Sequence, residues 1–472
     1  MSRARLHPLH FFNYIQYAVV LCAVPVVQEL LDWDFPGAWA ALWQGFAILA
    51  GCLLLTVVLW RTSRVALAGG VLSVAGGLVL WRTAFYRTAT ISAVELRRPL
   101  WLAPFGAAEL FLFFTGGTRL RRIKLVLPHG KAAEFTRALL PLGPTRAAFA
   151  PAGMGRLHFA LLSANVAATS FFALSAANRI SQLIGEDVGA LALGGLQHAG
   201  QLLALFLPAG LSLLAAVVLF FFVLSLVASW LRTFRFSAGR FGDILVCRGG
   251  LLSRTERRIR VPCITAATLK TSPLARLLRR RPLYLQAGTF APTDLPLLMV
   301  QRGNLQTLYQ LLPELADPPV PACEPRRKSP GQYLWRPGSL SLLLAALLAV
   351  AQRTLPGIAP LLGVLLALAL AGVACGVEAL LKEGAAMDAR GRMALCYTRA
   401  LTRYDLLLLT KDCTISVFAT PPAQLAGRCN LRVRTPSRKT LLVRSLPLPL
   451  AQTLAAAGCR GGTRPNTQRE EV

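Results

Sequence analysis

Long apolar runs alternate with mixed polar stretches along this chain, and the runs occur in closely spaced pairs. They cover roughly residues 13–31 and 38–60, a stretch that begins near His158 together with 202–230, and 339–351 together with 358–381. A helix needs about 20 mainly apolar residues to cross a bilayer. The pattern therefore predicts about six transmembrane helices in three hairpins, with the fifth run the shortest.

The polar segments that follow the hairpins have a pattern of their own. In the first two segments, strand-like runs flank a pair of glycines, Gly76-Gly77 and Gly249-Gly250, and an isoleucine follows fifteen residues later, at Ile91 and Ile264. Alternating apolar residues predict strands, and a glycine pair between them predicts a tight turn. The third segment, 393–435, keeps the order of runs without the paired glycines.

Each polar segment ends in a short stretch with apolar residues at three-to-four spacing, at 131–142, 303–315 and 448–458. That spacing is typical of an amphipathic helix. The recurring unit is therefore a membrane hairpin, a run of short strands and a closing helix, repeated three times. Strands followed by one helix suit a small curved antiparallel sheet or partly open barrel.

The distribution of charge orients the hairpins. The formal net charge is +30, and 47 of the 51 Lys and Arg residues lie in three segments. Residues 61–156 carry 14 basic residues against 3 acids, 231–337 carry 18 against 6, and 382–472 carry 15 against 6. Because basic loops stay on the cytoplasmic side, all three segments and both termini are expected there.

Three strings carry a family resemblance: "CRGGLLSRTERRIRVPCI", "TSPLARLL" and "GRCNLRVRT". They resemble the bacterial pleckstrin-homology (PH) domains that are attached to membrane hairpins, and the three-fold arrangement is similar to the YdbT-like membrane proteins. The resemblance implies two near-orthogonal antiparallel sheets with a capping helix in each segment. It also implies a multi-pass protein of the bacterial cytoplasmic membrane, but no activity, because a fold does not assign a function.

The predicted fold class is an α+β membrane protein with three PH-like domains. The expected boundaries are hairpin 1 at 1–60, PH-like domain 1 at 61–150, hairpin 2 at 157–230, PH-like domain 2 at 231–318, a basic linker at 319–337, hairpin 3 at 338–381, a diverged PH-like domain 3 at 382–460, and a disordered tail at 461–472.

The motifs argue against catalysis. The chain has no GxxxxGK[ST], HExxH or GxSxG string, its ten cysteines form no CxxC pair, and its five histidines have no ligand spacing. No catalytic residue, metal or cofactor is therefore predicted. The alternative to a binding protein is a transporter or channel component, with Gln44, Asn165 and Glu378 as the polar groups inside the spans. Hydrogen bonds between helices and an i,i+4 pair of Glu378 with Lys382 would explain these residues equally well.

The strongest candidate for binding is a basic cluster in the second polar segment. Its members are Arg254, Arg257, Arg258, Arg260, Arg276, Arg279, Arg280 and Arg281. Near an anionic leaflet each basic residue contributes about 1 kcal/mol. The cluster predicts contact with anionic lipid, unless its arginines are simply solvated and keep the domain in the cytoplasm. Nucleic acid is disfavoured because no aromatic stacking platform accompanies the arginines.

The sequence thus predicts a non-enzymatic scaffold at the inner leaflet. Its partners would be the membrane itself, anionic lipid headgroups, or another PH-domain membrane protein. The run Arg279–Arg281 stands where the first and third segments have a turn glycine, Gly106 and Gly427.

Overall fold

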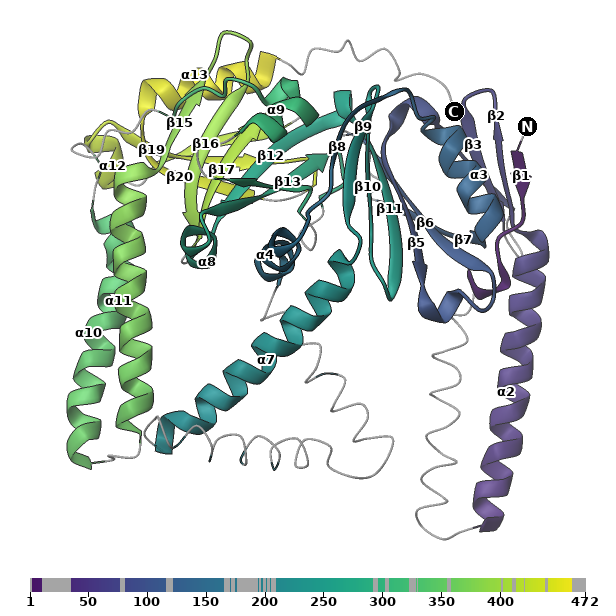
Figure 1. The fold of residues 1–472 in the computed structure, drawn as a ribbon, viewed down its shortest axis with the longest axis horizontal. Helices are drawn as coiled ribbons and strands as arrows, with labels where there is room; N and C mark the ends of the chain where they lie inside the picture. Colours follow the sequence, from purple (N-terminus) through teal and green to yellow (C-terminus); the bar gives the residue numbers. More distant parts are fainter. Residues whose placement is uncertain are drawn as a thin grey trace.

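The fold is a layer of antiparallel sheets from which long apolar helices extend on one side (Figure 1). The computed structural model describes residues 2–10, 35–76, 81–115, 122–164, 209–291, 296–301, 305–321, 328, 330–354, 358–399, 402–409, 413–419, 421–437 and 440–460, and single residues between 170 and 204.

Four described helices are long and apolar enough to cross a membrane. They are α2 (Phe35–Thr62), α7 (Ala209–Thr233), α10 (Gly331–Thr354) and α11 (Ala359–Lys382). They match the runs expected at 38–60, 202–230, 339–351 and 358–381. The run at 13–31 and most of the run after His158 lie outside the described residues, although α4 (Met154–Ser163) covers the start of the latter. The predicted tail at 461–472 also lies outside them.

Helix α10 begins earlier than the apolar run that predicted it. Residues 331–337 were expected to belong to a linker, but they form its first turns, with Pro337 inside the helix. Helix α11 approaches this turn closely at Gly376, where an added Cβ would lie 2.9 Å from the Tyr333 carbonyl oxygen. Small residues permit such an approach between apolar helices, so the pair is tightly packed at the end nearest the strand layer.

The N-terminal sheet contains a strand that the sequence did not suggest. Its order is β1-β2-β3-β4, formed by Ser2–Ala4, Arg64–Ala68, Val71–Gly76 and Arg82–Arg87. Three residues are too few for a periodic pattern, and β1 is recognised only by its pairing of Ser2 with Leu67. The chain start is thereby attached to the strands that follow α2.

A seven-stranded sheet joins residues from both sides of the second hairpin. Its order is β7-β6-β5-β11-β10-β9-β8, and the strands are β5 (Ile91–Pro99), β6 (Ala107–Phe114), β7 (Arg122–Pro128), β8 (Thr145–Phe149), β9 (Ser237–Phe241), β10 (Ile244–Gly249) and β11 (Ser253–Arg260). The two halves meet where β5 pairs with β11, from Ala93 opposite Ile259 to Pro99 opposite Ser253. One sheet therefore contains strands from two polar segments that the sequence predicts as separate units.

A six-stranded sheet joins the next two segments in the same way. Its order is β14-β13-β12-β17-β16-β15, and the strands are β12 (Ile264–Thr271), β13 (Arg280–Ala287), β14 (Leu298–Gln301), β15 (Gly384–Met387), β16 (Met393–Arg399) and β17 (Thr402–Leu408). Here β12 pairs with β17, from Ala266 opposite Leu408 to Thr271 opposite Arg403. A C-terminal sheet follows, made of β18 (Thr414–Phe418), β19 (Arg428–Arg434) and β20 (Thr440–Pro447).

Short helices pack against the sheets. They are α3 (His129–Leu139), α8 (Pro273–Leu277), α9 (Gln306–Leu311), α12 (Pro421–Leu425) and α13 (Leu448–Arg460). Three main apolar cores result, and α3, α9 and α13 each contribute to a different one. Two alanines are packed into the core of the segment that follows their own. Ala93 of β5 lies in the core that contains α9, and Ala266 of β12 lies in the core that contains α13.

Candidate functional site

The most prominent cavity lies where the hairpin α10–α11 meets the strand layer. Its volume is about 1260 Å³, which exceeds the ~300–1,000 Å³ of ordinary small-molecule sites. One wall comes from strands of the six-stranded sheet and from β20, and the other comes from the N-terminal part of α10 and the C-terminal part of α11. A ligand here would have one end against a polar sheet and the other against membrane helices.

The two walls differ in chemistry. The helix wall is mostly apolar, with Pro337, Leu340, Leu368, Gly372 and Ala379, although Gln332 and Arg336 of α10 also belong to it. The strand wall carries Thr268, Gln286 and several tyrosines. The helix wall continues into the segments that are long and apolar enough to span a membrane. The cavity therefore matches an amphiphile, with a polar head at the strands and an apolar tail along the hairpin.

The charged side chains among the described lining residues are all positive. Among the described lining residues are the four cations Lys270, Arg336, Arg399 and Arg444, and no aspartate or glutamate. Arg444 forms an ion pair with Glu383, 2.9 Å from Nη2 to Oε1, while no ion pair with a described carboxylate is found for the other three. Burial lowers the pKa of the Lys270 ammonium below its usual range, because desolvation penalises the charged form. An anion in the cavity would relieve this penalty.

The cavity also holds polar atoms that have no protein partner. The hydroxyl of Thr268 and Oε1 of Gln332 are buried without a hydrogen bond to any described residue. Buried polar atoms are nearly always paired in folded proteins, and each exception needs an explanation. Thr268 Oγ1 and Gln332 Oε1 are thus polar atoms beside the cavity that the described protein groups leave unpaired.

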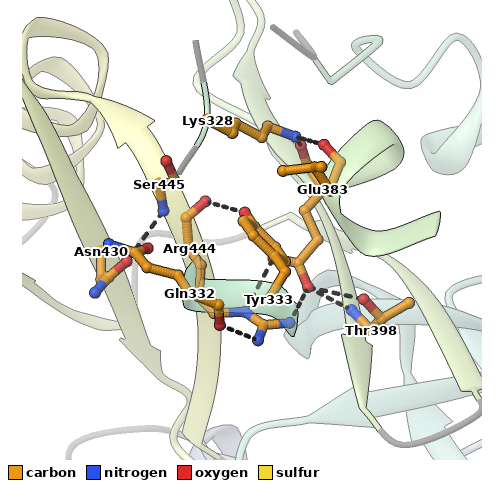
Figure 2. Close-up of polar contacts among 9 residues, drawn as sticks. Lys328, Gln332, Tyr333, Glu383, Thr398, Asn430, Arg444 and Ser445 are labelled. Carbon is orange, nitrogen blue, oxygen red and sulfur yellow. Dashed lines mark hydrogen bonds and ion pairs between the residues drawn. The ribbon is translucent and has the colours of Figure 1, made fainter. Parts of the chain in front are cut away.

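A network of polar contacts joins the strand wall of the cavity to the hairpin α10–α11 (Figure 2). Glu383, at the end of α11 and only 1% exposed, accepts hydrogen bonds from the backbone N–H of Thr398 at 3.1 Å and from its hydroxyl at 2.8 Å. The guanidinium of Arg444 pairs with Glu383 and lies over the Tyr333 ring, 4.4 Å from the ring centroid. The Tyr333 hydroxyl in turn donates to the Arg444 carbonyl oxygen at 2.9 Å. Strand β20, strand β16 and both helices of the hairpin are thereby held together.

Lys328 completes this junction. It is buried, and its ammonium donates to the carbonyl oxygens of Leu380, at 2.8 Å, and Glu383 at the C-terminus of α11. The last carbonyls of a helix have no intrahelical partner and carry partial negative charge, so a cation there is favourable. In the sequence Lys328 belongs to a linker rich in basic residues, and nothing in that linker distinguishes it from its neighbours.

A known protein family matches the middle of the chain. Residues 188–315 match the bacterial PH domain family. The matched range includes β9 to β14 and α9, the strands and closing helix of the second polar segment. Searches of curated proteins and of solved structures give no match. The PH-domain match therefore covers the strands that provide Thr268 and Lys270, while the hairpin wall of the cavity lies outside it.

The predicted basic cluster, all of it within this PH-domain match, separates into different environments. Arg257 and Arg258 are buried: Arg257 pairs with Glu95 across the β5–β11 joint at 3.1 Å, and Arg258 pairs with Glu256 at 2.7 Å. Burial raises the pKa of Glu256, but hydrogen bonds from Arg258 and Arg248 outweigh it and the pKa is lowered. Arg257 thus joins β11 to β5, whereas the ion pair of Arg258 stays within β11 and its Nη1 donates to the Leu140 carbonyl oxygen at 2.8 Å. Neither arginine faces solvent.

The other six arginines lie nearer the surface. Arg260 donates to the Ala89 carbonyl oxygen at 3.3 Å, Arg276 pairs with Glu378 of α11, and Arg281 lies 3.5 Å from Asp405. No ion pair with a described residue is found for the remaining three, Arg254, Arg279 and Arg280. None of the eight lines the cavity.

The polar residues expected inside the spans are also placed. Gln44 is exposed on α2, Asn165 lies outside the described residues, and Glu378 pairs with both Arg276 and Lys382. Glu378 thus joins α8 of the sheet layer to α11. Sequence reasoning found its pairing with Lys382 through the i,i+4 spacing, but it had no signal for Arg276, which is remote in the chain.

Proposed function

We propose that this protein is a non-enzymatic membrane scaffold that binds an anionic phospholipid at the junction of its third hairpin with the strand layer. The cavity's lining is the observation that carries the proposal. Its described charged residues are four cations and no carboxylate, with Lys270, Arg399 and Arg444 on the strand wall and Arg336 on α10, and the helices add apolar side chains. At an anionic leaflet such a site gains both charge attraction and apolar burial.

The architecture we propose is three PH-like units, each preceded by a hairpin. Unit 1 spans 61–150, unit 2 spans 231–318 and unit 3 spans 382–460. Support comes from the PH-domain match in unit 2 and from the order of elements, because each unit has six strands followed by a helix, and in unit 1 the helix α3 is followed by β8. A second support is the backbone: Gly106, Arg279 and Gly427 precede corresponding strands and have φ of 62°, 52° and 63°. This conformation is rare outside glycine.

The proposed location is the bacterial cytoplasmic membrane, with the strand layer and both termini in the cytoplasm. The basic segments support this orientation, and the described apolar helices all leave the layer on the same side (Figure 1). Helix α2 stands at one end of the layer and the pair α10–α11 at the other. This separation favours a scaffold over a transporter that would need its described spans in one bundle.

Lipid retention tests the proposal. The full-length protein is purified in mild detergent, exposed to phosphatidylglycerol or phosphatidylcholine, and analysed by native mass spectrometry. We expect retention of phosphatidylglycerol in preference to phosphatidylcholine. In Lys270→Gln and Arg399→Gln, retention should fall by about tenfold each, because a hydrogen bond to a charged group contributes about 1.5–3 kcal/mol.

Arg137→Gln is the matched control. Arg137 is exposed on α3, distant from the cavity wall, and the substitution removes the same charge. Its retention of phosphatidylglycerol should equal that of the unchanged protein. Equal retention of the two lipids, or equal loss in all three variants, would refute a specific site at the hairpin and would leave only general attraction to anionic surfaces.

A further inference from the structure

The proposed units are joined by strand pairing, and the joints have one form. Strand β5 of unit 1 pairs with β11 of unit 2, and β12 of unit 2 pairs with β17 of unit 3. In each joint the fourth strand of one unit meets the third strand of the next. The row of three units leaves one third strand and one fourth strand outside these joints. They are β4, the third strand of unit 1, and β18, the fourth strand of unit 3. In the described part of the chain, β4 pairs only with β3 and β18 only with β19.

We propose that a second copy of this chain extends the series, with β18 of one copy paired antiparallel to β4 of the next. The end of the series would then repeat the joints inside it. The inference does not depend on lipid binding, and it uses the three-unit architecture only to derive the register.

The register follows from the internal joints. The fourth-strand residues at the joints are Ala93 and Ala266, which pair within their own units with Phe113 and Gln286, seven residues after Gly106 and Arg279. In unit 3 the residue seven after Gly427 is Arg434, and it pairs with Thr414. Thr414 is therefore the equivalent of Ala93 and Ala266.

The acceptor strand is aligned in the same manner. Ala93 and Ala266 meet Ile259 and Leu408 of the next unit. Within their units Ile259 pairs with Leu245 and Leu408 with Met393, and these residues lie in the unit's own core. The corresponding core-facing pair of unit 1 is Tyr86 with Leu72. Thr414 should thus lie opposite Tyr86, which puts Val417 opposite Thr83 and Phe418 opposite Arg82.

The two edges are suited to pairing. Edge strands are usually blocked by proline, a bulge or an inward-pointing charge, and Thr83–Tyr86 and Thr414–Phe418 contain no proline and no charge. Phe85 is 70% exposed and Phe418 38% exposed, so each edge leaves an aromatic ring in solvent. Phe418 already has Arg432 over its ring at 5.0 Å, and the proposed register brings Arg82 to the same ring as a second cation–π partner.

The joint between chains should be weaker than the joint between units 1 and 2. That internal joint contains the buried Glu95–Arg257 ion pair. The equivalent positions on the two edge strands are Ser416 of β18 and Ala84 of β4. Contact between unlike ends is heterologous and gives a ring or an open row. Since all described apolar helices leave the layer on one side (Figure 1), a joint that repeats the internal ones keeps every copy in one membrane.

Cysteine crosslinking of full-length protein in its membrane tests the register. Two tagged chains are co-expressed, one with Thr83→Cys and the other with Val417→Cys, and oxidised. Directly opposed strand residues have Cβ atoms about 4.5–5.5 Å apart, close enough for a disulfide after small adjustments. We expect mixed-tag dimers from this pair, but not from the out-of-register pair Thr83→Cys with Thr414→Cys. Chains with only their native cysteines give the background.

A charge exchange provides the second measurement. Ala84→Arg combined with Ser416→Glu rebuilds the internal ion pair between chains, while Ala84→Arg with Ser416→Arg opposes two like charges. The first combination should give about fivefold more mixed dimer than the second, the scale of a cross-strand charge effect. Equal yields from the two combinations, equal yields in and out of register, or no mixed dimer would overturn the proposal.

Salt separates this inference from the proposed lipid binding. The chain carries a formal net charge of +30, so two copies repel each other and added salt screens that repulsion. Crosslinking should be maintained or increased at high salt, whereas retention of an anionic headgroup should decrease. Loss of crosslinking in lipid-binding protein would refute only the joint, and loss of lipid retention in crosslinked protein only the headgroup site.

Discussion

The buried ion pair between Glu95 and Arg257 provides the most demanding test of the shared sheet. Their side chains are 6% and 7% exposed, and Oε1 of Glu95 accepts from both Nε and Nη2 of Arg257 at 3.1 Å. The residues come from β5 and β11, on opposite sides of the second hairpin. Glu95→Gln removes the Glu95 charge from beside the buried Arg257 guanidinium, although Gln has nearly the same shape.

The expected loss is large. Removing one partner of a buried pair costs about 3–5 kcal/mol. At roughly 2–4 °C per kcal/mol for a cooperative unit of 150–250 residues, the thermal midpoint of the strand layer should fall by about 6–20 °C. The assay is intrinsic fluorescence of the full-length protein in one detergent during heating, with every variant scanned at the same rate.

Glu134→Gln is the matched control, because it removes the same charge from an exposed pair with Lys131 and should shift the midpoint by less than about 2 °C. The double substitution Glu95→Leu with Arg257→Met should recover most of the loss, since well-packed apolar residues can replace a buried pair. A midpoint for Glu95→Gln no lower than that of Glu134→Gln would refute the argument that this joint is a closed, desolvated interface.

Three further outcomes are expected. Arg279→Gly should raise the free energy of unfolding by about 0.5–1 kcal/mol in denaturant titration, because φ is 52° there and the left-handed strain exceeds the entropy cost of glycine. Gly376→Ala should lower the thermal midpoint, because the new Cβ would lie 2.9 Å from the Tyr333 carbonyl oxygen and overpacking costs about 1–3 kcal/mol; an unchanged midpoint would contradict the close approach of α10 and α11. Burial and Lys124 lower the pKa of His10 from 6.5 to about 4, so the folded state favours the neutral imidazole. The stability that this preference contributes is complete above pH 6.5 and is lost as the pH falls through 4. At pH 5 the loss is about 2 kcal/mol. The protection factors of the β1 amides, which are corrected for the slower intrinsic exchange at lower pH, should therefore fall between pH 7 and 5 in the unchanged protein but not in His10→Asn.

Local patterns in the sequence predicted the elements better than their partners. The apolar runs located the four described helices that are long and apolar enough to span a membrane. The alignment of the run Arg279–Arg281 with Gly106 and Gly427 anticipated a turn, and Gly106, Arg279 and Gly427 all have positive φ. These features depend on residues close in the chain. Whether β5 pairs with β11 depends on residues that the second hairpin separates, and no periodicity within either strand records it.

The same limit applies to the candidate site. Lys270 and Arg399 lie in different polar segments and come together only because β12 pairs with β17. The arginine-rich stretch was conspicuous in the sequence, yet Arg257 and Arg258 are buried in ion pairs. A cluster of like residues along the chain is thus a weak guide to a binding surface, because alternate positions of a strand face opposite sides.

The joint between β5 and β11 also has a consequence for synthesis. The ribosome completes β5 about 150 residues before β11, and at roughly 5–20 residues per second this interval lasts about 8–30 s. During it α7, which is long and apolar enough to span a membrane, is made while β5 still exposes an open edge. The placement of α7 therefore affects the time for which the nascent chain is exposed to mispairing, and a delay should favour aggregation of a protein whose finished strand layer closes that edge.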